Sequence, residues 1–239
     1  MQDEVTKHTR KIFSIMKSGN HTLSGKTKEI LVEILIIVFA VTISIWLHSW
    51  SQHNHQQNEV KEFLADIRAD INDNLKTMNG AKETLANSIA SYSYLANLEE
   101  RQYDSLVKTP QGDSLISKKM EVNILIRRNA NGNYEGFKSS GKIGYIENKK
   151  LKKLILSYYQ RSIPALVEVD SYYNQTLKEV INYYIEEAKR STRENLFDPR
   201  FKTRIALTRN TAEGSKRSYE VIIEEAKELI AEIDKEMQE

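Results

Sequence analysis

One strongly apolar run stands near the start of the chain. It reads ILIIVFAVTISIWL over residues 34–47, and the uncharged stretch continues to Trp50. Counted from Glu33 to Trp50, a helix of this stretch is about 27 Å long, close to the roughly 30 Å hydrocarbon thickness of a bilayer. The pattern predicts a transmembrane helix over residues 29–50.

The residues at the two ends of the run suit the two membrane interfaces. Glu33 can lie at the headgroup level, one turn after Glu29. Trp46 and Trp50 share a helical face at the opposite interface, where amphipathic rings collect. The alternatives are a buried core helix and a cleaved signal peptide, but the polar residues after the run offer no small-residue cleavage site. An uncleaved anchor is therefore the preferred interpretation.

Basic residues set the predicted orientation of this helix. Six precede it, whereas none occurs between Ser51 and Glu59, so the N-terminus is expected in the cytoplasm. The predicted organisation is a basic cytoplasmic tail over 1–28, the transmembrane helix over 29–50 and an extracytoplasmic domain over 51–239. The six basic residues are Lys7, Arg10, Lys11, Lys17, Lys26 and Lys28.

The tail also carries apolar residues at helical spacing. Val5, Ile12, Phe13 and Met16 would share one face of a short helix, with basic residues around it. Such a helix can lie on anionic lipid. A frayed tail that only sets the topology fits equally well, so both interpretations stay open.

Thin apolar stripes follow the run. Apolar residues repeat near every 3.5 positions over 64–106 and again over 151–184, which predicts two long helices. A final helix is expected from about Thr211. Pro110 should end the first helix, and Pro164 should kink the second.

The chain between these helices is harder to assign. Residues 115–128 begin like a helix but alternate like a strand from Met120 to Ile126, and a helix is the prediction. Residues 129–144 hold four Gly together with Asn and Ser, which is typical of a substantial loop.

Composition favours long helices. The 239 residues include only 9 Gly and 3 Pro, and neither type occurs between Trp50 and Asn79, so the membrane helix should continue into the outer domain. The predicted fold is all-α, with the transmembrane helix continuing into an extracytoplasmic antiparallel helical bundle of three to four long helices.

Charge and cysteine content narrow the function classes. With 35 basic and 33 acidic residues, the chain has no strong overall field that would attract nucleic acid. The lack of Cys excludes disulfides, thiolate catalysis and Cys-based zinc sites. No nucleophile, base and orienting group can be grouped from the sequence, so we expect neither an enzyme nor a bound cofactor.

Three histidines lie close together after the apolar run. Imidazole is a common metal ligand, but offsets of five and two place His48, His53 and His55 on different helical faces. A solvated polar collar is the favoured interpretation. Glu33 is likewise expected to reach the headgroups or a partner helix rather than to form part of an ion pathway.

A glycine-rich segment matches the phosphate-binding pattern Gly-x-x-x-x-Gly-Lys from Gly136 to Lys142. Ile143 stands where Ser or Thr should coordinate magnesium, and no hydrophobic strand precedes the segment. A turn before a helix at Ile146 is therefore the prediction. The segment remains a candidate interaction loop, made of Phe137, Lys138, Ser139, Ser140, Gly141 and Lys142.

The 12 Tyr residues also have two interpretations. Rings on long helices can line a ligand pocket. They more often fill the core while their hydroxyls reach the surface, which is the interpretation favoured here. The residues concerned are Tyr92, Tyr94, Tyr158, Tyr159, Tyr172, Tyr173, Tyr183 and Tyr184.

Two segments, VEILIIVFAVTISIWLHSWSQ and YEGFKSSGKIGYIENKKLKKLILSYY, resemble an uncharacterised family of single-span inner-membrane proteins common in Bacteroidetes. That family typically opens its span with Gly-Glu-Ile and closes it with Asn-Asn-Trp-Asn-Glu. Glu33, Ile34 and Trp50 stand at matching positions, whereas Val32 replaces the Gly and the polar closing residues differ. The resemblance runs from about Ser24 onward. It implies an inner-membrane anchor with a periplasmic helical domain, and no catalytic residues.

Together these patterns predict a membrane-anchored, non-enzymatic interaction or scaffold protein. Its expected partners are the lipid bilayer and another envelope protein or a second copy of itself. The alternative is an extracytoplasmic ligand sensor of the chemoreceptor-like helical-bundle type. Because about 28 residues would lie in the cytoplasm, such a sensor would need a separate signalling partner.

Overall fold

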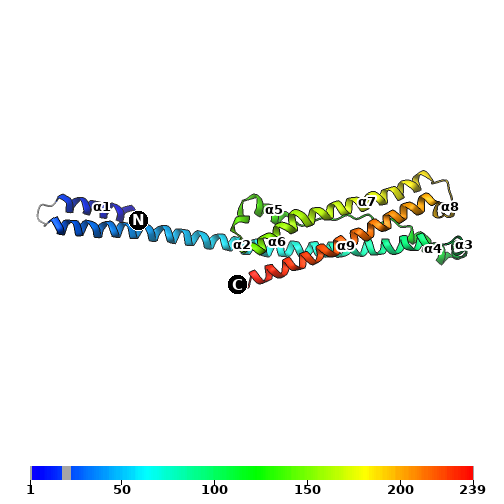
Figure 1. Ribbon diagram of the computed structural model, residues 1–239, viewed down its shortest axis with the longest axis horizontal. Coiled ribbons are helices and arrows are strands. Elements are labelled where there is room, and N and C mark those ends of the chain that lie inside the picture. Colours follow the sequence, from blue (N-terminus) through cyan, green and yellow to red (C-terminus); the bar gives the residue numbers. More distant parts are fainter. Residues whose placement is uncertain (1, 18–22, 239) are drawn as a thin grey trace. The chain divides into compact units, whose positions relative to one another are not determined.

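The computed structural model describes residues 2–17 and 23–238, which are almost entirely helical (Figure 1). No strand occurs among these residues, so the all-α prediction is confirmed. The helices are α1 (Gln2–Lys17), α2 (Leu23–Asn97), α3 (Glu100–Leu106), α4 (Pro110–Lys119), α5 (Gly132–Ser139), α6 (Lys149–Ser157), α7 (Ile163–Glu186), α8 (Thr192–Leu196) and α9 (Pro199–Glu236), with a short 3₁₀ helix over Lys142–Tyr145 and a π-helical turn over Tyr158–Ser162.

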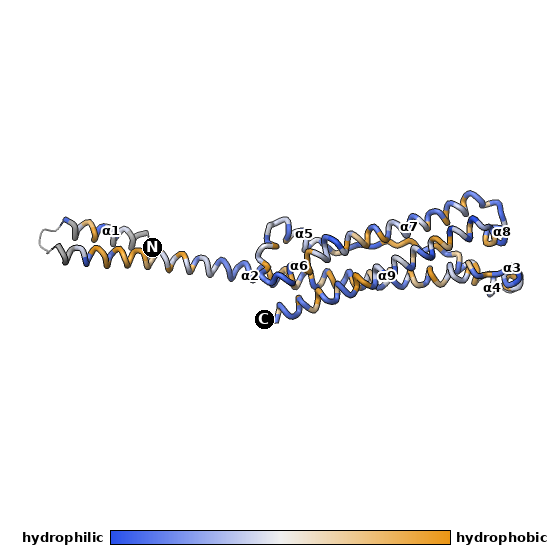
Figure 2. Tube along the Cα trace, in the orientation of Figure 1, coloured by the Kyte–Doolittle hydropathy of each residue, from blue (hydrophilic) through white to orange (hydrophobic). Residues whose placement is uncertain are grey.

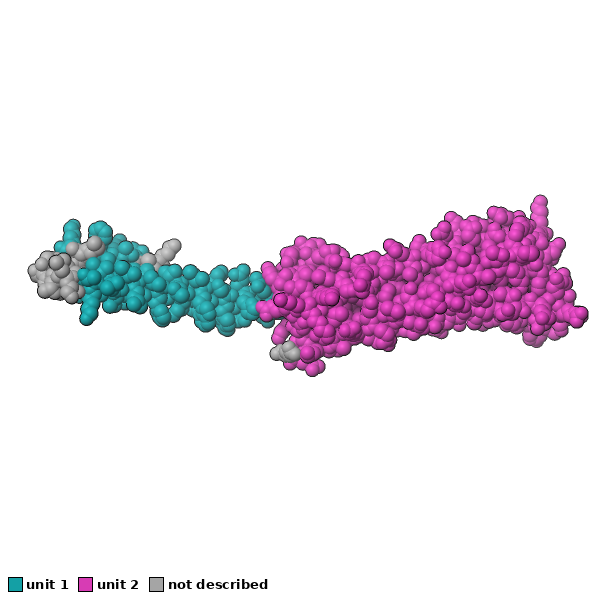
Figure 3. Space-filling model, viewed as in Figure 1, with its two compact units in different colours: residues 1–59 teal, residues 60–239 magenta. Residues whose placement is uncertain are grey.

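The chain divides into two compact units, Met1–Glu59 and Val60–Glu239 (Figure 3). Helix α2 contributes to both, since its residues up to Glu59 belong to the first unit and the rest belong to the second. The predicted absence of a break between Trp50 and Asn79 is confirmed, because α2 is one continuous helix.

The first unit carries the apolar run of α2, visible as a continuous orange stretch in Figure 2. By length and composition, α2 is the one helix among the described residues that could cross a membrane. Only 6% of its most apolar window is buried, whereas a core helix would be mostly buried. Leu35 and Phe39 are 68% and 62% exposed. The hydroxyl of Thr42, a polar residue in this run, donates to the carbonyl of Val38 at 2.8 Å.

The second unit is built on three long helices, the later part of α2 with α7 and α9. Helices α2 and α9 run in opposite directions, since Arg68 pairs with Asp234 and the ammonium of Lys202 donates to the carbonyls of Leu95 and Ala96 at the end of α2. Between α7 and α9, Thr208 donates to the carbonyl of Thr176. The fully buried side chains include Leu64, Ile67, Ile71, Met78, Leu85, Tyr173, Leu177, Ile205, Tyr219, Leu229 and Ile233.

An extended segment, residues 121–131, lies beside these helices. The helix predicted over 115–128 is present over residues 115–119, at the end of α4, and is wrong from Glu121 onward. Two asparagine side chains hold the extended segment. Asn174 accepts from the amide of Leu125 at 2.9 Å and donates to its carbonyl at 2.8 Å. Asn74 makes the same two bonds to Ala130, at 2.8 and 3.0 Å. These side chains replace the partners that a helix or sheet would supply to the backbone.

The extended segment carries the chain from α4 to α5, along the long helices, in only 11 residues. At about 3.3 Å per residue, 121–131 can span about 36 Å. The 24 residues of α7 span about the same length at 1.5 Å per residue. The segment therefore matches a long helix in length but is thinner.

Two predicted helix boundaries are wrong because prolines begin helices here. Helix α2 already ends at Asn97, and Pro110 opens α4, where Thr109 accepts from the amide of Gly112 at 3.1 Å. Helix α9 begins at Pro199 rather than near Thr211, since Asp198 accepts from the amide of Arg200 at 2.8 Å. Proline suits the first helical turn, where its missing amide hydrogen costs nothing.

Two other regions also differ in part from the prediction. The interruption expected at Pro164 takes the form of the π-helical turn over Tyr158–Ser162, directly before α7. The loop expected over 129–144 is mostly helical, because α5 and the 3₁₀ helix occupy it. Asn148 caps α6 by accepting from the amide of Leu151 at 3.0 Å.

Candidate functional site

The three residues predicted at membrane interfaces all lie on the first-unit part of α2. Trp46 and Trp50 are 63% and 57% exposed. Glu33 is only 4% exposed, and its carboxylate lies 2.7 Å from the ammonium of Lys11 on α1. Glu33 is thus half of an ion pair with the tail, a contact that the sequence did not reveal. Of the predicted apolar face of the tail, the side chains of Val5 and Met16 lie outside the described residues.

The candidate interaction loop combines an anchored end with an exposed tip. The ring of Phe137 stacks on Phe63 of α2 at 3.8 Å between centroids. Ser140 donates to the carbonyl of Phe137 at 2.8 Å, and Gly141 adopts a φ of +75°, which favours glycine. Lys138, Ser139 and Ser140 are exposed. The tip therefore offers a polar surface on a fixed support.

The phosphate-binding pattern does not have the backbone it would need. Gly136 and Ser139 lie within α5, so their amide groups belong to a helix rather than to a loop that cradles an anion. The turn predicted here is present as the short 3₁₀ helix from Lys142 to Tyr145.

The three histidines after the apolar run do not come together as a site. His48, His53 and His55 are exposed on α2. His55 lies 3.6 Å from Glu59, one helical turn later. Within the described residues, no three His, Asp or Glu side chains come together as a metal-ligand set.

Most of the tyrosine rings fill the core. Tyr92, Tyr159 and Tyr173 are at most 5% exposed. The hydroxyls of Tyr92, Tyr159 and Tyr184 are also buried, without a partner among the described residues, so the expectation that they reach the surface is wrong. Burial raises the pKa of Tyr158 to about 12.

A buried polar cluster that the sequence did not predict joins three elements of the second unit. The Arg127 side chain, on the extended segment, is 3% exposed, and its Nε donates to Asp170 of α7 at 3.0 Å. The other oxygen of Asp170 accepts from the hydroxyl of Tyr219 on α9. Arg127 Nη1 donates to Asn129. The remaining nitrogen, Nη2, is buried, and Arg127 also has a side-chain hydrogen bond with Tyr219.

A cavity of about 210 Å³ lies beside this cluster. Its walls come from one face of α2, from the extended segment and from α9. Gly80 and Ala81 supply little side-chain volume, and the neighbouring extended segment is thinner than a helix, so space remains between them. The lining residues are Thr77, Gly80, Ala81, Thr84, Ile124, Leu125, Ile126, Arg127 and Tyr219.

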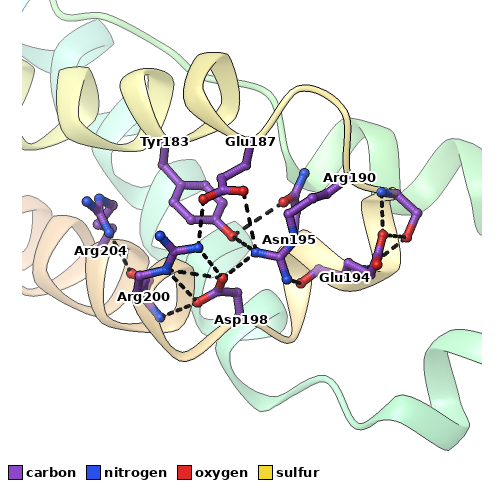
Figure 4. A network of polar contacts seen from close by, with 9 residues as sticks. Tyr183, Glu187, Arg190, Glu194, Asn195, Asp198, Arg200 and Arg204 are labelled. Atoms are coloured by element: carbon purple, nitrogen blue, oxygen red, sulfur yellow. Dashed lines mark hydrogen bonds and ion pairs between the residues drawn. The ribbon is translucent and has the colours of Figure 1, made fainter.

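A second polar cluster closes the turn between α7 and α9 (Figure 4). Asp198 accepts from the side chains of Arg200, at 2.9 Å, and Arg190, and Arg200 also donates to Glu187 at 2.7 Å. The guanidinium groups of Arg200 and Arg190 hold the pKa of Asp198 well below its usual range. Burial, and then the nearby Asp198, raise the pKa of Tyr183.

The same turn is capped by its own side chains. Ser191 accepts from the amide of Glu194 at 3.2 Å, while the Glu194 carboxylate accepts from the amide of Ser191 at 2.8 Å. This reciprocal pair is a capping box. Since both Asp198 and Ser191 act as helix caps, the cluster accounts for the shape of the turn.

A larger hollow, of about 550 Å³, lies on the outer face of α6 and the π-helical turn. It is a shallow surface feature, and Lys152, one of its basic side chains, donates to the carbonyl of Gly144 at 3.3 Å. Its lining residues are Lys149, Lys152, Lys153, Leu156, Ser157, Gln160 and Arg161.

Comparison with protein-family models, curated proteins and solved structures gives no match. The family resemblance drawn from the sequence therefore stays a prediction. The candidate sites rest on the geometry alone, and among them the cavity beside Arg127 lies next to a buried charged group.

Proposed function

We propose that this protein is a single-pass, membrane-anchored interaction protein that binds another protein of the cell envelope or a second copy of itself. The observation that carries the proposal is the apolar run of α2, whose large side chains are exposed and are not covered by the other described residues. Exposed apolar area costs about 25 cal/mol per Å² in water, and a bilayer removes that cost. The proposed role involves no catalysis.

In this proposal the second unit is an extracytoplasmic helical bundle with an unusual fourth element. The three long helices pack around a common core, and the extended segment 121–131 takes the place of a fourth helix. The basic tail before the span supports a cytoplasmic N-terminus, by the positive-inside rule. The exposed tip of the loop at Lys138, Ser139 and Ser140 is the proposed contact surface for the partner.

Membrane insertion can be tested with the natural tryptophans. The chain has 2 Trp, and both lie in the proposed interfacial belt, so no other tryptophan contributes to the emission. We expect brominated lipids in reconstituted vesicles to quench this fluorescence, most strongly with bromines near the headgroups. Emission that no brominated lipid quenches would overturn the anchor.

Orientation can be tested with single cysteines, because the natural chain has none. Ser14→Cys and Ser114→Cys place a thiol at exposed positions on α1 and α4. A membrane-impermeant maleimide added to spheroplasts should label the second variant and leave the first unlabelled until lysis. The reverse pattern would invert the proposed topology.

The partner can be sought by chemical cross-linking in native membranes, with a C-terminal tag and mass spectrometry of the retained proteins. Lys138→Glu should reduce recovery of the partner, because it reverses a charge at the exposed loop tip. Lys118→Glu, at an exposed lysine of α4, is the matched control and should leave recovery unchanged. Recovery of neither a specific partner nor a dimer would contradict the proposal.

A further inference from the structure

One exposed face of α1 presents an aromatic ring between two cations. Arg10, Phe13 and Lys17 stand three and four residues apart, so their side chains share one face of the helix. All three residues are exposed, and Phe13 is 72% exposed. Neither cation forms an ion pair with another described residue. This face therefore combines an uncovered apolar ring with two positive charges that the described chain does not neutralise.

An ion pair on a different face of α1 fixes its level along α2. The ammonium of Lys11 lies 2.7 Å from the carboxylate of Glu33. Glu33 directly precedes the apolar run over 34–47, so the pair holds the middle of α1 at the level where that run begins. If the run spans a bilayer, as proposed above, this level is the boundary between headgroups and hydrocarbon. The exposed face of α1 then lies within reach of the lipid headgroups.

The headgroup layer of an anionic membrane matches both parts of this face. Aromatic rings collect at the boundary of the hydrocarbon, and basic side chains are attracted to anionic lipid. Free phosphate would match the cations but would leave the ring of Phe13 in water. The two acidic residues of α1, Asp3 and Glu4, lie in its first turn, away from the stripe. We propose that α1 binds anionic lipid, with the ring at the headgroup boundary and with Arg10 and Lys17 on lipid phosphates.

A fluorescent reporter on α1 tests this inference in the full-length chain. Ser14→Cys introduces the only thiol, at an exposed position next to Phe13. A nitrobenzoxadiazole dye attached there becomes brighter and emits at shorter wavelength when it leaves water. We compare nanodiscs of phosphatidylcholine with nanodiscs of equal amounts of phosphatidylcholine and phosphatidylglycerol. We expect brighter, shorter-wavelength emission in the anionic discs.

Salt and a soluble phosphate separate the sources of this response. High salt should reduce the difference between the two kinds of disc, because it screens the attraction between the cations and the lipid. Glycerol 3-phosphate added to the neutral discs should leave the emission unchanged. If it reproduces the full response, the cations bind a soluble phosphate, and the assignment of lipid is overturned.

The cations are tested by a double variant with a matched control. Arg10→Gln with Lys17→Gln removes both charges of the face. Since each basic residue near an anionic leaflet changes the binding constant by roughly a factor of five, most of the response should be lost. Lys108→Gln with Lys118→Gln makes the same change in charge at exposed lysines of the second unit and should keep the response. A response that persists in the α1 variant would overturn the inference.

The ring is tested separately by Phe13→Ala. This variant keeps both cations, so the salt-sensitive response to anionic lipid should remain. The shift to shorter wavelength should become smaller, because no ring draws this face toward the hydrocarbon. An unchanged shift would overturn the placement of the ring. Circular dichroism of every variant in the same discs should show the helix content of the natural chain.

The inference and the proposed anchor can fail separately. Brominated lipid in the same discs reports insertion through the fluorescence of Trp46 and Trp50. If these are quenched while the dye emits equally in neutral and anionic discs, the anchor stands and the lipid-binding face is overturned, including the case in which α1 binds only a protein. If the tryptophans are not quenched, the anchor itself fails, and the inference fails with it.

Discussion

Two clusters in the second unit are both built from Arg, Asp and Tyr side chains, but they differ in how far these side chains are exposed to solvent. In the middle of the unit, Arg127 and Asp170 are enclosed with Tyr219, and the guanidinium is 3% exposed. At the turn before α9, Asp198 pairs with two arginines, of which Arg190 is 32% exposed and Arg200 is 57% exposed. Water can complete the second cluster but is largely excluded from the first.

The difference shows how burial changes the contribution of an Arg–Asp pair to stability. An exposed pair contributes little, and solvent replaces a partner that is lost. A buried pair must satisfy every donor internally, and breaking it leaves a charge without compensation. The turn cluster is therefore explained by helix capping, whereas the enclosed cluster joins the extended segment to α7 and α9 and is satisfied within the core.

The largest expected effect is that of Asp170→Ala. It would leave the Arg127 guanidinium buried without its carboxylate, and we expect the free energy of unfolding to fall by about 3–5 kcal/mol. Urea unfolding of the full-length chain in detergent, followed by circular dichroism, measures this. The double variant Arg127→Met with Asp170→Leu should lose much less, because neither charge remains. Equal losses in the single and double variants would contradict the comparison.

Asp198→Ala should have a smaller effect. It removes the N-cap of α9, but water can solvate Arg190 and Arg200 once the carboxylate is gone. We expect the Tm to fall by roughly 3–6 °C, since a cap contributes modestly and the chain is large. Thermal unfolding by circular dichroism measures the shift, with Asp113→Ala on the exposed first turn of α4 as the control. A loss as large as that of Asp170→Ala would show that exposure does not separate the clusters.

The turn cluster also predicts a pH dependence. Its arginines lower the pKa of Asp198 in the folded chain, so between that value and the ordinary value near 4 the unfolded chain binds more protons. The stabilisation is present above about pH 4 and is lost as the pH falls toward the folded pKa. Comparing Tm against pH for the natural chain and Asp198→Asn should show a shallower acid decline in the variant. Parallel curves would contradict this account.

The smallest expected effect is a gain in stability. Gly80→Ala adds a methyl group where no atom lies within 4 Å and reduces the flexibility of the unfolded chain, so stability should rise by about 0.5–1 kcal/mol. Gly214→Ala in α9 is the matched control, because it also has open space and should give a similar gain. Urea unfolding measures both. A loss of stability in Gly80→Ala alone would mean that the wall of the cavity has no room for the added methyl group.

The sequence reveals the features of this fold that depend on local pattern. The uncharged run over 34–47 and the stripes around Leu64 and Leu151 predict helices because hydrophobic spacing is local. The start predicted near Thr211 is about one dozen residues too late, although Asp198 and Pro199 form a good helix start.

The rest depends on contacts between residues far apart in the chain. The pattern over 115–128 leaves helix and strand open, because the asparagines that hold the extended segment lie 49 and 56 residues away from the backbone groups they bind. Nothing close to Arg127 in the sequence marks it as buried, since its partner Asp170 is 43 residues away. No spacing rule connects these positions, so neither the cluster nor the cavity is visible without the fold.

The two asparagine contacts also fix how many residues the extended segment can contain. Asn174 holds Leu125, Asn74 holds Ala130, and Arg127 lies between them with its side chain turned inward while Ile126 faces solvent. Because successive side chains of an extended chain alternate, inserting or deleting one residue between these two points would turn the guanidinium outward. In homologous chains, length changes should therefore accumulate elsewhere and avoid this stretch of the sequence.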